Sequence, residues 1–253
     1  MRFADLSRTE LGRLADRALV VLPVGACEQH GPHLPTGTDH VIVERVAVAA
    51  AERVDGVPVL VAPTVAVGFS EHHLPYGATI SVSLDTLRRY LVDCCDSLIR
   101  SGFRRIFLLN GHGGNVDVIG DAAREVATRT GVPVASGSYW VIAWDALVAL
   151  GAPGSGLLPG HAGAFETSLA RAVRPDWVVS GPPERDWRPR TAAGSFYPPY
   201  RVDDPAVWRR NDGYTDSPAG ADPEAGTRYL EAIVGAVARA FEEFHVDGGG
   251  GRG

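Results

Sequence analysis

Short apolar runs alternate along the chain with longer segments in which apolar residues recur at the spacing of an α-helix. The short runs predict buried strands of a parallel sheet, at 18–22, 58–62, 105–109 and 132–135. The longer segments predict helices, at 40–53, 84–100, 116–129, 165–173 and 223–244. Because strands and helices alternate, we expect an α/β fold, a parallel-sheet sandwich with helices on both faces.

Residues with capping chemistry mark where several of these helices begin and end. Ser7, followed three residues later by Glu10, predicts a capping box that opens a short helix before the first strand. Ser83 is a predicted N-cap, and Gly131 follows a predicted helix end. These signals place helix boundaries independently of the apolar pattern.

No internal repeat or linker divides the chain. We therefore predict a single domain over 1–246, followed by a disordered Gly-rich tail over 247–253. The segment 175–218 is rich in Pro, Trp and Arg and has weak periodicity. We interpret it as an excursion that covers the functional site or contacts another subunit.

Charge and cysteine content exclude several classes of partner. The net charge is -6, and all 24 basic residues are Arg without a basic block, so we expect no nucleic-acid or membrane partner. No apolar run is long enough to span a membrane, and the N-terminus lacks the apolar core of a secretory signal. Three cysteines, an odd and sparse count, suit a reducing compartment, so we expect a cytoplasmic protein.

Loops rich in Gly or Pro follow three predicted strands and carry acidic or imidazole side chains, at 23–39, 68–79 and 110–115. A fourth polar cluster lies at 161–168. Strand-end loops of a parallel sheet meet at one edge, which would bring five metal-ligand side chains to one pocket: Glu28, His30, Asp39, His112 and Glu166. This mixed set suits Zn, Mn or Fe better than Ca or Mg. Five ligands exceed the needs of a single catalytic zinc, so we expect two divalent metal ions per chain that share a carboxylate and a water.

Each of these residues also has a simpler interpretation. Asp39 is placed to cap the helix that follows it, and Glu166 to favour a helix N-terminus. His30 and His33 could be hydrogen-bonded loop residues. The 110–115 loop could cradle a phosphate, although it lacks the Lys of a P-loop.

Cys27, beside Glu28, suggests a nucleophilic thiol. Nitrilase-type amidases pair their Cys and Glu with a Lys, and this chain contains no Lys. Residues two apart in an extended segment face the same way, so Glu28 and His30 should share a direction while Cys27 and Gln29 face away. We therefore interpret Cys27 as a packing residue.

Three motifs in order resemble those of the creatininase (creatinine amidohydrolase) family: Glu28-Gln29-His30-Gly31-Pro32-His33, Asn110-Gly111-His112-Gly113-Gly114-Asn115, and His161-Ala162-Gly163-Ala164-Phe165-Glu166. The resemblance implies a dinuclear metal amidohydrolase with a doubly wound α/β fold that forms a homo-oligomer, with a hexamer favoured. It implies that the five side chains named above are the metal ligands, with Asp39 as the bridge. The implied catalytic residues are His161, which transfers protons at a pKa near neutrality, and Glu166. Expected substrate contacts are Ser70, Gly111, Gly113 and Trp140.

Two departures from the creatinine-cleaving enzymes bear on the substrate. Those enzymes carry an acidic ligand where this chain has Gly114, and an aromatic residue and a Glu just before His161, where this chain has Leu157-Leu158-Pro159-Gly160. The Asn-Gly-His-Gly-Gly-Asn form resembles formamide hydrolases of flavin and deazaflavin biosynthesis and the peptidase of mycofactocin maturation. We therefore expect hydrolysis of a cyclic amide, formamide or related small-molecule amide. The alternatives are a peptidase acting on a modified peptide and a non-catalytic small-molecule-binding member of the fold.

Overall fold

The computed structural model describes residues 1–152, 158–177, 205–210 and 212–247. Four parallel strands form one sheet in the order β2-β1-β3-β4. They are β1 (Leu19–Val24), β2 (Val59–Val61), β3 (Ile106–Asn110) and β4 (Val134–Ser138). The predicted parallel sheet is confirmed, and β4 lies slightly later in the chain than its apolar run suggested.

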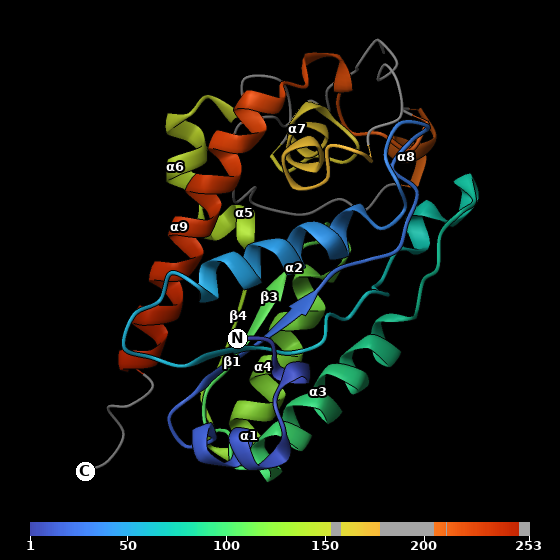
Figure 1. The fold of residues 1–253 in the computed structure, drawn as a ribbon. Helices are drawn as coiled ribbons and strands as arrows, with labels where there is room; N and C mark the ends of the chain where they lie inside the picture. The colour runs from blue at the N-terminus through green and yellow to red at the C-terminus, as the bar shows by residue number, and fades with distance from the viewer. Residues whose placement is uncertain (153–157, 178–204, 211, 248–253) are drawn as a thin grey trace.

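Both faces of this sheet are covered by helices, as the apolar pattern predicted. Successive residues of a strand face opposite sides, so β1 sends Leu19 and Val21 into one core and Val20 and Leu22 into the other. The first core packs against α2 (Thr38–Ala51) and α9 (Pro223–Asp247), and the second against α3 (Leu84–Arg100) and α4 (Val116–Thr130). Figure 1 shows the sheet between these two pairs.

The remaining described helices are short. They are α1 (Arg8–Leu14), α5 (Tyr139–Ile142), α6 (Trp144–Ala149), α7 (Ala164–Val173) and α8 (Pro205–Arg210). The capping box of Ser7 and Glu10 is confirmed, as is the cap at Ser83. Gly131 ends α4 with a φ of 70°, which glycine adopts without steric cost. Most of 175–218, and the tail from 248 onward, lie outside the described residues.

The strand order explains where a site can form. The chain passes from β1 outward to β2 on one side and then returns to place β3 on the other side of β1. Loops that leave the ends of β1 and β3 therefore diverge and open a crevice, which is where ligands bind in open α/β sheets. The register pairs Val24 with Asn110, so the loops 25–37 and 111–115 start side by side.

Among the described residues, none of the helices has the length and apolar character needed to cross a bilayer.

Candidate metal centre

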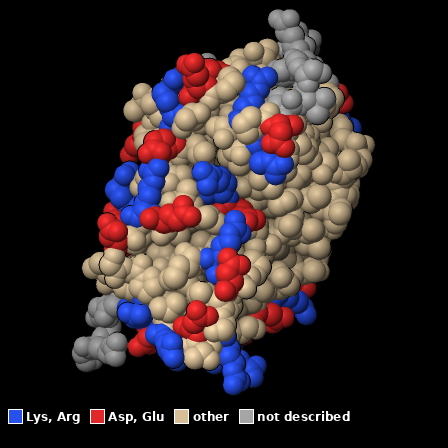
Figure 2. Space-filling view, viewed as in Figure 1, with Lys and Arg blue, Asp and Glu red and all other residues tan. Residues whose placement is uncertain are grey.

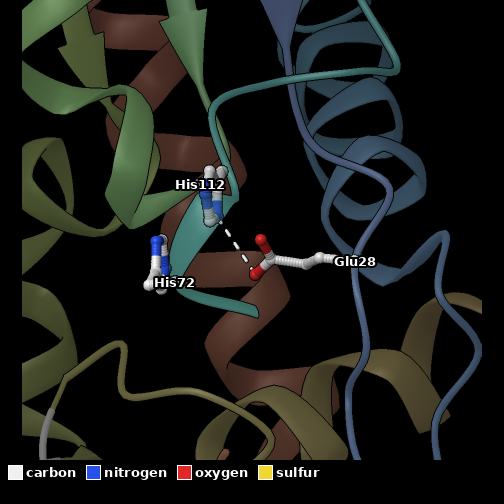
Figure 3. Close-up of side chains that lie close together, drawn as sticks. All are labelled: Glu28, His72 and His112. Carbon is white, nitrogen blue, oxygen red and sulfur yellow. Dashed lines mark ion pairs between the residues drawn. The ribbon is translucent and has the colours of Figure 1, made fainter. Parts of the chain in front are cut away.

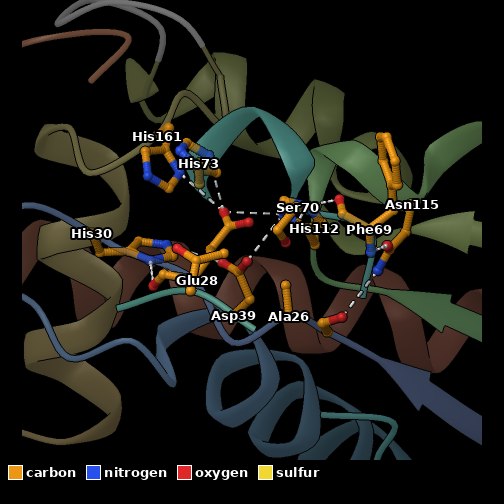
Figure 4. Close-up of polar contacts among 12 residues, drawn as sticks. Ala26, Glu28, His30, Asp39, Phe69, Ser70, His73, His112, Asn115 and His161 are labelled. Atoms are coloured by element: carbon orange, nitrogen blue, oxygen red, sulfur yellow. Dashed lines mark hydrogen bonds and ion pairs between the residues drawn. The ribbon is translucent and has the colours of Figure 1, made fainter. Parts of the chain in front are cut away.

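Glu28 lies at the centre of the crevice and is fully buried. Its Oε1 lies 3.2 Å from His112 Nδ1, 3.3 Å from His161 Nδ1 and 3.3 Å from His73 Nε2 (Figure 4). Neither carboxylate oxygen makes a hydrogen bond. Burying a carboxylate without hydrogen bonds is costly, and a bound cation relieves that cost. The surroundings of Glu28 therefore fit a metal ion.

Asp39 lies between two of the predicted ligands. Its Oδ1 lies 3.1 Å from His30 Nε2, and its Oδ2, which makes no hydrogen bond, lies 3.1 Å from His112 Nδ1. Helix α2 has Gly37 as its N-cap without a side-chain hydrogen bond, so the interpretation of Asp39 as a cap is wrong. The position of Asp39 between two imidazoles is the one that a bridging carboxylate needs.

The orientation of three imidazoles also suits metal binding. His112 Nε2 donates to the Phe69 carbonyl at 2.9 Å, and His161 Nε2 donates to the Gln29 carbonyl at 2.8 Å. His30 Nδ1 lies 3.1 Å from the Glu28 carbonyl, to which it donates. Because a carbonyl only accepts, the outer nitrogen of each ring carries a proton, and once the ring is neutral the other nitrogen, which faces the carboxylates, can bind metal.

Three groups of candidate ligand atoms occur among the described residues, each with its atoms within 4.8 Å of one another. They are Glu28 with His30 and His161, Glu28 with His72 and His112 (Figure 3), and His30 with Asp39 and Glu166. All five ligands predicted from the sequence belong to these groups. The structure thus brings the five together, and it adds His72 and His161 as further ligand-type nitrogens.

Burial and charge shift the pKa values in this cluster in opposite directions. Burial alone would lower the pKa of His30, but Asp39, Glu166 and Glu28 raise it to about 10. Burial raises the pKa of Glu166 to about 8. Burial and the imidazoles of His73, His30 and His112 lower the pKa of His161 well below its ordinary value, so the near-neutral value expected for His161 is wrong.

The 110–115 loop is fixed by its two asparagines. Asn110 Oδ1 accepts from the His112 N–H and its Nδ2 donates to the His112 carbonyl, while Asn115 accepts from the Phe69 N–H and donates to the Gly25 carbonyl. The N–H of Gly111 donates to the Val24 carbonyl. The N–H groups of Gly111 and His112 are therefore engaged within the protein and cannot bind a phosphate.

A cavity of about 710 Å³ opens on the cluster, and Gly111 and Gly113 line it as predicted. Ser70 and Trp140, the other expected substrate contacts, are not among its lining residues. Ser70 is fully buried with its hydroxyl 3.4 Å from His112 Nε2, and Trp140 packs edge-on against Tyr139 in the core. Neither side chain lines the cavity, so a contact of Ser70 or Trp140 with substrate stays a prediction.

Cys27 and His33 both lie outside the cluster of candidate ligands. Cys27 turns its thiol toward Thr36 Oγ1, 3.8 Å away. His33 is buried against Thr167, whose hydroxyl lies 2.9 Å from its Nε2. Neither residue lines the cavity.

Sequence reasoning missed three residues at the site. His73 lies within reach of Glu28, Gln29 contacts His73 and His161 from behind, and Trp208 of α8 lies over the imidazoles with ring centroids 4.7 Å from His73 and 4.9 Å from His72. His72 and His73 are adjacent, and nothing in the sequence shows which of the two is buried. Trp208 comes from the weakly patterned segment 175–218, which we expected to cover the site.

Comparison with known proteins shows which family the chain belongs to. The family model Creatininase, described as creatinine amidohydrolase, matches residues 4–241. A creatinine amidohydrolase from Pseudomonas putida is 33% identical over 90% of this chain and 90% of its own length. A mycofactocin precursor peptide peptidase from Mycobacterium ulcerans is 34% identical over 64% of this chain and 60% of that protein, so the chain spans less than two thirds of this relative.

Solved structures agree with the sequence relatives. Those described as "Creatininase Mn" and as a mutant creatininase of "Zn-Zn type" each superpose with a TM-score of 0.77 at 30% identity, covering 96% of this chain and 97% of theirs. The fold is a doubly wound parallel α/β fold, and the buried cluster is a candidate metal site. The chain belongs to the creatininase family.

Proposed function

We propose that this protein hydrolyses the C–N bond of a cyclic amide, a formamide or a related small-molecule amide at a centre of two divalent metal ions. The observation that carries the proposal is the convergence of buried carboxylates and imidazoles. Oxygens of Glu28 and Asp39 that make no hydrogen bond lie 3.1 to 3.3 Å from imidazole nitrogens of His112 and His161. Bound there, divalent metals lower the pKa of a coordinated water and polarise a carbonyl. Zn, Mn and Fe each suit this donor set.

The residues divide into those that hold metal and those that handle substrate. The proposed ligands are Glu28, His30, Asp39, His112 and Glu166, with Asp39 shared. His161, the proposed proton-transfer residue, turns Nδ1 toward the cluster, and its lowered pKa keeps the ring neutral. The backbone of Gly111 and Gly113 at the cavity wall is placed to contact substrate.

A hydrolysis screen tests the proposal directly. Purified protein loaded with Mn²⁺ or Zn²⁺ should hydrolyse at least one member of a panel of creatinine, lactams and formamides, and His112→Ala should abolish that activity. Elemental analysis should find about two transition-metal ions per chain. Full activity of protein that carries no metal would overturn the proposal.

A peptidase acting on a modified peptide is the second candidate. It is favoured by the 34% identity to the mycofactocin precursor peptide peptidase and by a cavity large enough for more than one small ring. The same screen should therefore include short peptides with modified C-terminal residues. Cleavage of these peptides and of no small amide would select this alternative.

Metal binding should release protons. At pH 7 the metal-free protein keeps a proton on His30, whose pKa is raised to about 10, and on Glu166, whose pKa is raised to about 8. Both groups must lose these protons to coordinate metal, so the apparent affinity should rise as the pH increases from 6 toward 10. Calorimetry with Zn²⁺ in two buffers of different ionisation enthalpy measures this release. Equal heats in the two buffers would contradict the prediction.

Trp208 should form an aromatic wall of the substrate pocket. Its ring lies edge-on to His73 and His161, with centroids 4.7 and 5.8 Å away. We expect Trp208→Ala to raise KM roughly 3- to 10-fold through lost stacking, and Trp208→Phe to recover most of the loss. Steady-state kinetics on the best substrate of the screen provides the measurement. An unchanged KM in the alanine variant would show that substrate does not touch this ring.

We also propose a cytoplasmic homo-oligomer, with a hexamer favoured. The flank on the right of Figure 2, where residues 62–83 run in Figure 1, shows few charged side chains. Exposed apolar side chains occur in and next to this segment: Leu74, Ile80, Leu84 and Tyr90. A second copy of the chain would bury this surface, and light scattering after size-exclusion chromatography would give the subunit number.

A further inference from the structure

His73 differs from the other imidazoles that surround Glu28. His112 and His161 each donate from their outer nitrogen to a backbone carbonyl, so in the neutral ring the inner nitrogen carries no proton. The outer nitrogen of His73, Nδ1, instead lies 2.9 Å from the side-chain nitrogen of Gln29. Which of these two atoms donates determines where the proton of His73 lies.

The orientation of the Gln29 amide is fixed by two backbone groups. The N–H of Gly31 donates to Gln29 Oε1 at 2.9 Å, and Gln29 Nε2 donates to the Gly213 carbonyl at 3.0 Å. If the amide were rotated by 180°, its NH₂ group would face the N–H of Gly31 and its oxygen would face the carbonyl of Gly213, so neither hydrogen bond could form. The second hydrogen on Nε2 remains for His73 Nδ1, because His161 Nε2, also nearby at 3.2 Å, is itself a donor to the Gln29 carbonyl.

His73 Nδ1 therefore accepts a hydrogen bond, and the ring proton lies on Nε2. The ring is fully buried, and it is among the residues that line the cavity. Nε2 lies 3.3 Å from Glu28 Oε1, yet neither atom makes a hydrogen bond, so the N–H is not directed at that carboxylate. It is a buried donor without an acceptor among the described residues, and it lies beside the proposed metal ligands.

We propose that His73, held by Gln29 with its proton on Nε2, is a catalytic residue that donates a hydrogen bond to the carbonyl oxygen of the substrate. This inference rests on the proposed amide hydrolysis and adds a second imidazole to it, with a role distinct from that of His161. A neutral donor aimed at the position where negative charge develops stabilises a transition state more than it stabilises bound substrate.

Two substitutions of His73 separate a substrate contact from a structural one. His73→Leu removes the donor, and we expect kcat to fall about 10²- to 10³-fold while KM changes little and metal content stays at the wild-type value. His73→Gln offers an amide N–H at a similar reach and should recover at least about tenfold of that loss. A leucine variant with wild-type kcat would overturn the proposal. So would a kcat loss matched by an equal loss of bound metal, because His73 would then only position Glu28.

A spectroscopic measurement tests the tautomer without turnover. In the Zn²⁺-loaded wild type, long-range ¹H–¹⁵N correlation should show His73 as the neutral ring with its proton on Nε2. Gln29→Glu replaces the amide donor with an acceptor and should move the proton to Nδ1 and lower kcat, which provides a second route if His73→Leu does not fold. A proton on Nδ1 in the wild type would overturn the inference. Wild-type protein that shows the expected tautomer but hydrolyses no amide would instead overturn the proposed function.

Discussion

Asp39→Asn is expected to lower kcat on the order of 10³-fold or more and to reduce bound metal from about two ions per chain to one or fewer. The substitution preserves size and removes the charge. Asp39 contacts His30 through Oδ1 and His112 through Oδ2, so it is the carboxylate that both halves of the cluster share. Loss of a bridging ligand should therefore weaken both metal positions, whereas loss of a terminal ligand should weaken one.

The matched control for this variant is Asp85→Asn. Asp85 occupies the first turn of α3 as Asp39 occupies that of α2, so both variants lose the same favourable interaction with a helix N-terminus. Asp85 is exposed and pairs with Arg88 and Arg89 at the surface, where such pairs contribute little. Elemental analysis and steady-state kinetics on both proteins provide the measurement. If Asp39→Asn retained two metals, the assignment of Asp39 as the bridge would be wrong.

Most of the fold could be predicted because the sheet is parallel and buried on both faces. Such strands appear as continuous apolar runs, and β1 and β3 agree with the predicted runs to within about two residues. The fourth strand was harder to place because β4 contains Ser136 and Gly137 and is only partly buried. Its pairing with β3, rather than its own apolar character, determines its position.

The candidate ligands could be recognised in the sequence because each one closely follows a strand end or opens a helix. Their supporting atoms could not be predicted in this way. The carbonyls that orient His112 and His161 belong to Phe69 and Gln29. Every residue has a backbone carbonyl, so this role cannot be recognised from the residue type. The support given to Gln29 by Gly213 spans 184 positions in the chain, a separation that no local pattern encodes.

Gly114→Ala is expected to weaken metal binding about 10- to 100-fold, with a matching loss of activity. A Cβ at this position would lie 2.3 Å from the Phe69 carbonyl oxygen and 2.5 Å from His112 Nε2. These are the two atoms of the hydrogen bond that presents the proton-free nitrogen of His112 to the carboxylates. One added methyl group would force them apart, and the backbone atom cannot move aside as a flexible side chain could.

Gly113→Ala is the matched control for this variant, because a Cβ at position 113 would meet nothing within 4 Å. Both variants add one methyl group to the same loop, so they share any loss of backbone freedom. We expect Gly113→Ala to keep wild-type metal content in elemental analysis and a wild-type melting temperature. Gly114→Ala should contain less metal and melt at a lower temperature. Equal metal content in the two variants would contradict the steric explanation.

The contact at Gly114 also bears on the choice of substrate. Creatinine-cleaving enzymes place an acidic ligand at this point of the loop, and the close approach of Phe69 and His112 leaves no room for one here. The carboxylate near His30 is instead Glu166 of α7, whose Oε2 lies 3.7 Å from His30 Nε2. Gly114→Glu should therefore lose metal rather than gain creatinine hydrolysis. Measuring both quantities on one preparation would show whether the loop geometry or the ligand count determines the substrate.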